Sequence, residues 1–153
     1  MSARMTNPAT ILPQAAKAVP HLLGAIEQGG VPATLRELIM LRASQINGCA
    51  ACVYGHVAAL RKEGESDERI DTVAVWRESP FFTDAERAAL NLTEAATRLA
   101  DSPGKAVSDA IWDEAADIFD EKAMAGIVLT IATINLFNRI NVTIGEPAGT
   151  TWS

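Results

Sequence analysis

The chain has 153 residues, with 13 lysines and arginines against 19 aspartates and glutamates and a formal net charge of -6. Because acidic side chains prevail and no cluster of Lys or Arg could neutralise phosphates, the composition argues against nucleic-acid binding. A chain of this length buries roughly 68 to 70 per cent of the surface that its unfolded form exposes, so folding requires no cross-link. We expect one domain over residues 1–153, with its core at about 35–142.

The location of the protein is predicted from two segments. The first ten residues lack the charged start, apolar core and cleavage-like site of a secretory signal, which predicts a cytoplasmic protein. The most apolar stretch, residues 124–137, contains two threonines and an asparagine and is shorter than the roughly 20 residues that span a bilayer. We interpret it as a buried helix and expect no membrane association.

The first half of the chain shows helical periodicity. Residues 11–28 predict a short, irregular pair of helices, broken at Pro20 and closed by Gly29 and Gly30. The next segment predicts an amphipathic helix over residues 35–46, with Glu37 beside its buried stripe. That stripe consists of Leu35, Leu38, Ile39 and Ile46.

Capping signals predict the later helices. A helix that carries the cysteines should run to about residue 62, and Ser66 should cap the next one, over residues 67–77. Thr83 and Glu86 form a capping-box pattern that opens a helix over residues 84–100. Two more helices are expected, from residue 108 or 109 to 116 and from 121 to 141 with an Asp120 cap, before a Gly- and Pro-rich tail from residue 145. Since no segment alternates with a period of two, the predicted fold is all-α.

The two cysteines of the chain, Cys49 and Cys52, lie close to His56 in a redox-like motif. If Gly48 opens a helix, these three residues stand at i, i+3 and i+7 and share one face. A disulfide across so small a loop contributes little to stability, because that contribution grows with loop length. The cysteine pair is therefore better explained by chemistry than by structure.

Asn47 and Gly48 favour the left-handed conformation that ends a helix, so they predict a turn between two antiparallel helices. In that hairpin Glu37 lies about 15 Å from the turn, His56 about 12 Å and Cys52 about 6 Å, at the helical rise per residue. Glu37 is then level with His56. The spacing suggests that the carboxylate orients the imidazole and that the imidazole takes the proton of the Cys52 thiol, directly or through water.

Three alternatives for these residues stay open. The cysteines could be inert buried thiols, or Cys49, Cys52, His56 and Glu37 could bind zinc, although structural zinc prefers Cys-rich sets from separate turns. Glu37 could instead be a surface charge that pairs with Arg36 or Arg42. The attacking sulfur is also open, because a helix N-terminus favours a thiolate at Cys49 and the nearby imidazole favours one at Cys52; we favour Cys52.

Glu-x11-Cys-x-x-Cys-x3-His resembles the core motif of the AhpD-like branch of the carboxymuconolactone decarboxylase family. Three surrounding segments resemble it as well: LRELIMLRASQINGC, AVWRESPFFTDAERAAL and IATINLFNRINV. The resemblance covers residues 35–142. It implies an all-helical homo-oligomer, from dimer to hexamer, that acts as a cysteine-based peroxidase or disulfide reductase without a metal or flavin cofactor.

The resemblance also implies roles for the motif residues. Glu37 and His56 would relay protons, Cys52 would attack a hydroperoxide, and Cys49 would resolve the resulting sulfenic acid into a disulfide. A dithiol or thioredoxin-like partner would then reduce that disulfide. The best-known members carry a histidine immediately before the second cysteine, where this chain has Ala51. One imidazole would then both accept and return the proton, which implies weak peroxidase activity or an unfamiliar substrate.

Two other functions remain as alternatives. A lactone decarboxylase like the namesake of the family has no need of a redox cysteine pair, and a non-catalytic redox sensor would change its assembly when the disulfide forms.

We expect structural roles for several residues outside the motif. His21 is expected in the surface or core, and Tyr54 and Trp76 are expected to pack. We expect Arg77 to interact with a helix C-terminus. Polar side chains follow one another on the apolar helix near its end, and we expect subunit contacts or the helix terminus to satisfy them rather than a substrate. They are Asn135, Asn138, Arg139 and Asn141.

Overall fold

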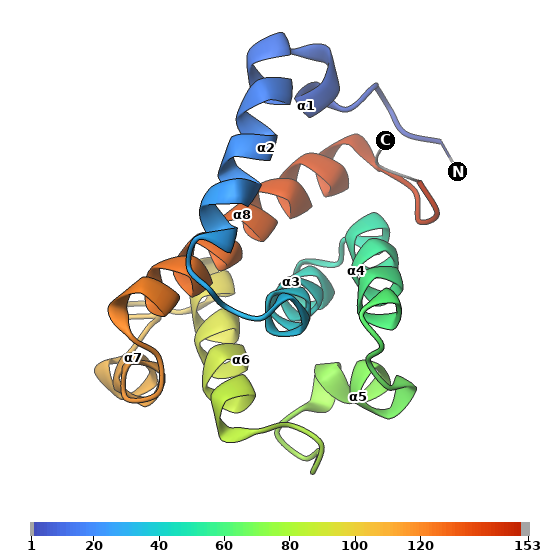
Figure 1. The fold of residues 1–153 in the computed structure, drawn as a ribbon. Helices are drawn as coiled ribbons and strands as arrows, with labels where there is room; N and C mark the ends of the chain where they lie inside the picture. Colours follow the sequence, from blue (N-terminus) through green and yellow to red (C-terminus); the bar gives the residue numbers. More distant parts are fainter. Residues whose placement is uncertain (1, 151–153) are drawn as a thin grey trace.

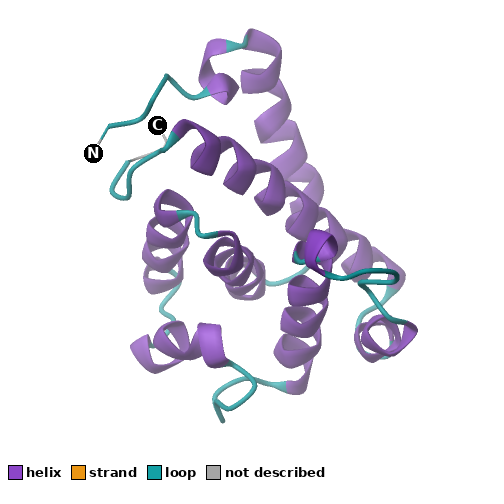
Figure 2. Ribbon diagram, turned by 180° about the vertical axis from the view of Figure 1, so that it is seen from behind, coloured by secondary structure: helices purple, strands orange, loops and turns teal. Residues whose placement is uncertain are grey.

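The structure, a computed structural model, describes residues 2–150, and every regular element within that range is a helix (Figure 2). The predicted all-α class is confirmed. In chain order the elements are α1 (Pro8–Ile11), α2 (Pro13–Glu27), α3 (Ala33–Asn47), α4 (Ala50–Lys62), α5 (Asp67–Thr72), the 3-10 helix η1 (Val73–Val75), α6 (Asp84–Thr97), the 3-10 helix η2 (Leu99–Asp101), α7 (Asp109–Ala116) and α8 (Glu121–Ile144).

Helix α3 lies at the centre, between α4, α6 and α8 (Figure 1). Leu38, Ile39 and Leu41 are completely buried although they point in different directions round the helix. The predicted stripe is therefore too narrow: Ile46 is only half-buried, and Met40 and Leu41 are buried as well. A helix surrounded on most sides is apolar on most sides, which explains why its periodicity identified only part of its buried surface.

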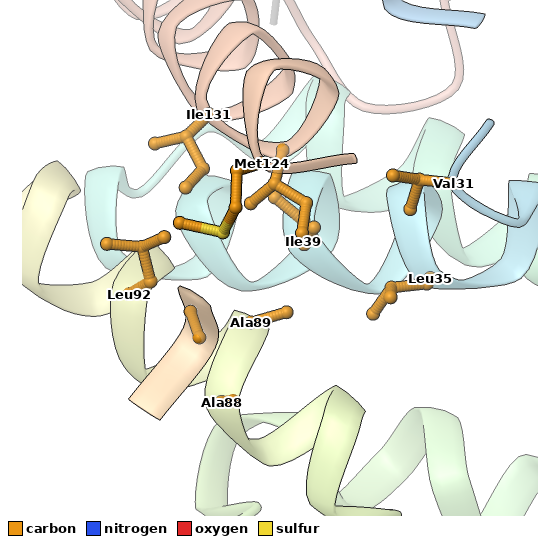
Figure 3. Close-up of a cluster of buried hydrophobic side chains, with 10 residues drawn as sticks. Val31, Leu35, Ile39, Ala88, Ala89, Leu92, Met124 and Ile131 are labelled. Atoms are coloured by element: carbon orange, nitrogen blue, oxygen red, sulfur yellow. The ribbon is translucent and has the colours of Figure 1, made fainter. Parts of the chain in front are cut away.

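One core cluster joins α3 to α6 and α8 (Figure 3). Ile39 and Leu35 of α3 meet Leu92 of α6 and Met124 of α8 there. Further side chains complete this cluster, among them Val31, Ala88, Ala89, Ala115, Ile127 and Ile131. This packing fixes α8 against α3, the helix that ends at the cysteines.

The predicted helix caps are present. Gly48 adopts a left-handed conformation (φ 67°) and ends α3. Thr83 and Glu86 form the complete capping box of α6. Side chains of Ser66, Ser108 and Asp120 accept hydrogen bonds from the first turns of α5, α7 and α8.

Some predicted boundaries are wrong. Helix α2 continues through Pro20, and the break comes earlier, at Leu12 between α1 and α2. Both helices begin with a proline, a position where the missing N–H costs nothing. Inside α2, Pro20 deprives the carbonyl of Ala16 of its helical partner, but Ala16 is exposed and water can serve instead. The helix expected over 67–77 ends at Thr72 and continues as η1, and α6 ends at Thr97 with η2 after it.

Helix α8 is longer than predicted and reaches Ile144. By length and composition it could cross a membrane, and it is the one helix between residues 2 and 150 that passes this test. Half of its most apolar 18-residue window is buried inside the protein, which agrees with the predicted buried helix. Gly145 ends α8 with a left-handed conformation, and the last part of the predicted tail, residues 151–153, lies outside the described residues.

Candidate redox site

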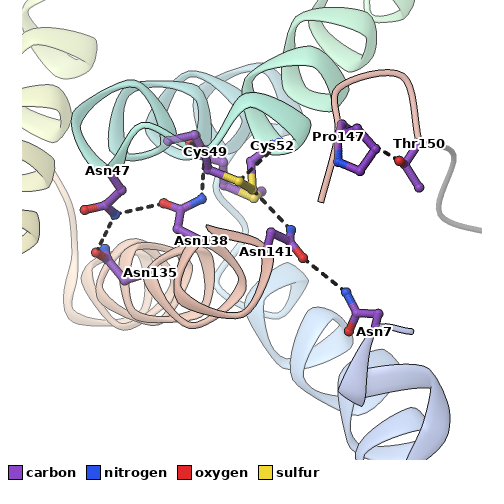
Figure 4. Close-up of a disulfide and its surroundings, with 11 residues drawn as sticks. Asn7, Asn47, Cys49, Cys52, Asn135, Asn138, Asn141, Pro147 and Thr150 are labelled. Carbon is purple, nitrogen blue, oxygen red and sulfur yellow. Dashed lines mark hydrogen bonds between the residues drawn. A yellow bond between two sulfur atoms is a disulfide. The ribbon is translucent and has the colours of Figure 1, made fainter. Parts of the chain in front are cut away.

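The turn from α3 to α4 places both cysteines at the start of α4 (Figure 4). Cys49 is the N-cap residue, and its sulfur accepts a hydrogen bond from the backbone N–H of Cys52 at 3.3 Å. The two residues form a disulfide, with 5.3 Å between their Cα atoms. Both are buried, with 1% of Cys49 and 5% of Cys52 exposed. Access to the sulfurs is therefore narrow.

Glu37 on α3 and His56 on α4 lie opposite each other, as the hairpin geometry predicts. The Nδ1 atom of His56 is 2.7 Å from Oε2 of Glu37. Because an ionised carboxylate only accepts hydrogen bonds, Nδ1 carries the proton and Nε2 of the neutral ring is left to accept one. The alternative pairings of Glu37 are wrong: Arg36 binds the carbonyl of Val31, and Arg42 binds a different glutamate.

His56 and Cys52 lie on α4 one turn apart, since His56 follows Cys52 by four residues. Within residues 2–150, no hydrogen bond joins His56 to either sulfur. In the disulfide neither sulfur carries a proton, so the predicted proton transfer concerns the reduced dithiol. The catalytic roles of Cys49, Cys52, His56 and Glu37 stay predictions.

Three asparagines of α8 form a buried row that faces the α3–α4 turn (Figure 4). Asn141 donates from Nδ2 to the sulfur of Cys52 at 3.3 Å. Asn138 donates to the hydroxyl of Ser44, and Asn47 donates to the amide oxygens of both Asn138 and Asn135. The donor–acceptor distances of the hydrogen bonds made by Asn138 and Asn47 are 3.0 Å or less.

The prediction that subunit contacts or the helix terminus satisfy this row is therefore wrong, because its amides bind groups of the same chain beside the disulfide. The spacing of Asn135, Asn138 and Asn141, three residues apart on an apolar helix, was the available signal. It showed that the amides share a face, but not which groups lie opposite. Arg139 is exposed, and its guanidinium donates to the backbone carbonyl of Asn135.

Other neighbours of the disulfide are less polar. Ala51 is 1% exposed and belongs to the apolar cluster that includes Met40, Ala43 and Ile134.

Tyr54 is 53% exposed, so its predicted packing role is wrong within this chain. His21 is exposed as well, which identifies it as a surface residue.

A buried carboxylate, Glu94, joins three elements outside the redox motif. Arg42 and Trp76 donate to its Oε1 atom at 2.7 and 3.0 Å, and Arg77 donates to Oε2 at 2.9 Å. Arg77 also stacks on the ring of Trp76, so its predicted contact with a helix C-terminus is wrong, whereas Trp76 does pack. Burial would raise the pKa of Glu94, but the hydrogen bonds from Arg42 and Trp76 and the positive charges lower it below its ordinary value.

Two surface hollows lie away from the disulfide. Two hollows, of about 720 and 750 Å³, adjoin α7 and α8, share Trp112, Val128 and Ala132, and include neither cysteine in their walls. Between residues 2 and 150, no three His, Cys, Asp or Glu side chains are grouped to hold a metal ion.

Several known proteins are similar to this chain. Residues 13–95 match the model of the carboxymuconolactone decarboxylase family. The uncharacterised protein YdfG of Bacillus subtilis (strain 168) is 36% identical over 138 residues, which cover 90% of this chain and 92% of YdfG.

Two crystal structures resemble the whole fold. One is a protein of unknown function from Agrobacterium tumefaciens, for which a role as the antioxidant defence protein AhpD has been suggested. It has a TM-score of 0.88 and 35% identity and covers 98% of this chain and 100% of its own. The other is the debrominase Bmp8, with a TM-score of 0.79 over 90% of this chain and 73% of its own. At 23% identity, Bmp8 shows a shared fold alone.

Proposed function

Because the chain belongs to the carboxymuconolactone decarboxylase family and has an AhpD-like fold, we propose that it is a thiol-dependent peroxidase that reduces hydroperoxides. The observation that carries this proposal is the disulfide between Cys49 and Cys52 beside the hydrogen-bonded pair of Glu37 and His56. The suggested antioxidant role of the A. tumefaciens protein supports it.

The first step oxidises Cys52. In the reduced protein, Nε2 of His56 takes the thiol proton, and Glu37 holds the imidazole through Nδ1. The thiolate attacks the terminal oxygen of the hydroperoxide, so that an S–O bond forms and the O–O bond breaks. The leaving alkoxide takes the proton from the imidazolium. The products are a sulfenic acid on Cys52 and one molecule of alcohol.

The second step involves Cys49. Its thiolate attacks the sulfur of the sulfenic acid, the S–O bond breaks, and hydroxide leaves and is protonated to water. The Cα atoms of the two cysteines are 5.3 Å apart, a spacing that allows the disulfide to form within the folded chain. An external dithiol or a thioredoxin-like carrier then supplies two electrons and two protons and becomes a disulfide itself.

Ala51 is expected to limit the rate. The AhpD-like pattern has a histidine here, but in this chain the position is a buried alanine among apolar neighbours. His56 would therefore be the only imidazole next to the cysteines, and it would both accept and return the proton. We expect turnover with a favourable substrate to be slow, and this agrees with the narrow access to the sulfurs.

Peroxide consumption by the purified protein tests the proposal. Wild type, Cys52→Ser and the control Tyr54→Phe are compared with hydrogen peroxide and an organic hydroperoxide, each with several dithiol donors. We expect turnover by wild type and the control and none by Cys52→Ser. A lactone decarboxylase activity that survives the loss of both cysteines would overturn the proposal. So would a disulfide that changes the oligomer without turnover, which is the behaviour of a sensor.

A further inference from the structure

The sulfur of Cys52 has a hydrogen-bond donor from another helix. Nδ2 of Asn141, on α8, lies 3.3 Å from this sulfur, and Asn141 is only 3% exposed (Figure 4). An N–H group gains little from a disulfide sulfur, which is a weak acceptor, but it forms a much stronger, charge-assisted bond with a thiolate. The contact therefore favours negative charge on Cys52 over the uncharged thiol and over the disulfide.

The direction of the Asn141 amide follows from a chain of hydrogen bonds. The backbone N–H of Ala9 donates to Oδ1 of Asn7, and a backbone N–H can only donate. The other end of the Asn7 side chain must then be its NH₂ group, which donates to Oδ1 of Asn141 at 3.1 Å. With its oxygen bound, Asn141 can present only its own NH₂ group to the sulfur. The start of α1 thus sets the polarity of an amide at the redox site.

The segment that carries Asn7 is attached to the end of α8. The backbone N–H of Arg4 donates to the carbonyl of Ile144 at 2.7 Å, and its guanidinium donates to the carbonyl of Thr143 at 2.9 Å. Asn7 itself is 8% exposed and caps α1. These contacts hold Asn7 close to Asn141 although 134 residues separate them in sequence.

We propose that Asn141 stabilises the Cys52 thiolate by direct contact, and that Asn7 is a positioning residue that acts through Asn141 by fixing the direction of its amide. The inference deepens the proposed function, because it adds a charge-stabilising group to the sulfur assigned to attack. It also bears on the conflict between the two cysteines: the backbone N–H at the helix N-terminus favours a thiolate at Cys49, whereas Asn141 acts on Cys52 alone.

The test measures the thiol without peroxide, so that it can fail or succeed independently of the peroxidase proposal. In a Cys49→Ser background, the rate of alkylation of Cys52 by iodoacetamide is followed against pH. We expect Asn141→Leu to move the midpoint up by about one pH unit, the equivalent of one charge-assisted hydrogen bond. The matched control is Asn135→Leu, which removes another buried amide of the same row and should leave the midpoint unchanged.

Asn7→Asp gives a second and milder variant. Aspartate still caps α1 by accepting from Ala9, but its other oxygen can no longer donate to Asn141. The Asn141 amide should therefore turn round and present its oxygen to the sulfur, which moves the Cys52 midpoint in the same direction as Asn141→Leu does.

A double-mutant cycle separates this effect from the added charge. If Asn7 acts through the amide, Asn7→Asp changes nothing further in the Asn141→Leu background. An equal shift in both backgrounds would mean that the carboxylate acts through its charge, and it would overturn the role of Asn7. Unchanged midpoints in folded Asn141→Leu and Asn7→Asp proteins, with folding checked by circular dichroism, would overturn the whole inference.

Discussion

At the scale of single residues, the proposed reaction depends on the direction of one hydrogen bond. The carboxylate of Glu37 receives Nδ1–H of His56 at 2.7 Å and so leaves Nε2 as the basic nitrogen. The two side chains come from different helices, and each is about one-fifth exposed. The pair is therefore mostly shielded from solvent but retains the exposure that the proposed proton transfer requires.

Loss of either partner should slow the reaction of the reduced protein with peroxide. Removal of a general base typically costs a factor of about 10² to 10⁴, so we expect His56→Ala to lower the rate constant by about 10² or more. Glu37→Gln should have a smaller effect in the same direction, because the amide can still accept from Nδ1 but has no charge to stabilise the imidazolium. Stopped-flow measurement of thiol loss gives both values.

The control for these variants is Glu63→Gln, which neutralises an exposed carboxylate at the end of α4. Equal rate constants for Glu37→Gln and this control would show that the carboxylate of Glu37 takes no part in the reaction.

Glu94 makes a different kind of contribution, to stability rather than to chemistry. It is the common acceptor for Arg42 of α3 and for the adjacent residues Trp76 and Arg77 that follow η1. Because its pKa is lowered in the folded protein, the ionised form stabilises the fold above the ordinary carboxyl value of 4.5, and this stabilisation is lost as the pH falls through the lowered value.

We expect Glu94→Ala to lower the free energy of unfolding by about 3 kcal/mol at neutral pH, since it leaves Arg42 buried without its partner. The difference from wild type should narrow at acidic pH, where Glu94 of the wild type becomes protonated. Urea unfolding of both proteins over a range of pH measures this. A difference that does not narrow as the pH falls through the lowered pKa would contradict the assigned charge state.

At the scale of helices, local signals predicted the hairpin that carries the site. Asn47 and Gly48 specify the turn through their own backbone preferences, and the side-chain caps of α5, α6, α7 and α8 lie within three residues of the N–H groups they bind. The level pairing of Glu37 with His56 followed from helical rise alone. These features depend on residues that are close in sequence.

The features that sequence reasoning missed depend on distant residues. Asn141 is 89 residues from Cys52, and Glu94 is 52 residues from Arg42. The pattern on α8 showed that Asn141 needed a partner and gave no signal for Glu94, and only tertiary packing brings either group to its partner. The continuation of α2 through Pro20 was missed for another reason. It depends on the exposure of the freed carbonyl of Ala16, which proline itself does not reveal.

The crossing of α2 and α8 gives a prediction at this scale. The backbone beyond α2 passes so close to α8 that a Cβ atom added to Gly126 would lie 3.0 Å from Cα of Gly29. Backbone cannot move aside as a flexible side chain can, so we expect Gly126→Ala to lower the free energy of unfolding by about 1 to 3 kcal/mol.

The matched control is Gly24→Ala, in the interior of α2, where an added Cβ meets nothing within 4 Å. Alanine should stabilise this position by about 0.5 to 1 kcal/mol, because it restricts the unfolded chain more than glycine does. Urea unfolding of the two variants beside wild type measures both effects. If both substitutions change stability in the same direction, the close crossing is not the cause.

At the scale of the whole molecule, the outward face of α8 carries several exposed apolar side chains. Val128, Leu136 and Val142 are each 44 to 48% exposed, and Trp112 of the adjoining α7 is 43% exposed. The same surface borders the two hollows beside α7. Exposed apolar side chains gathered on one face are typical of protein–protein contacts, so we propose that a second copy of the chain covers it.

Self-association should then depend on this face. We expect sedimentation velocity to show an oligomer, from dimer to hexamer, for wild type and a smaller species for Leu136→Glu, because a carboxylate in the contact would have to be desolvated. Ala58→Glu places the same charge on the exposed side of α4 and should leave the oligomer intact. A monomeric wild type at micromolar concentration would contradict the proposed contact.

The account as a whole rests on the claim that Cys52 attacks the peroxide and that Cys49 resolves the product. Mass spectrometry of the single-cysteine variants after one equivalent of hydroperoxide, with dimedone to trap sulfenic acid, tests this most directly. We predict that Cys49→Ser gains a dimedone adduct on Cys52 and that Cys52→Ser, treated in parallel, gains little on Cys49. An adduct confined to Cys49, or none on either variant, would contradict the claim.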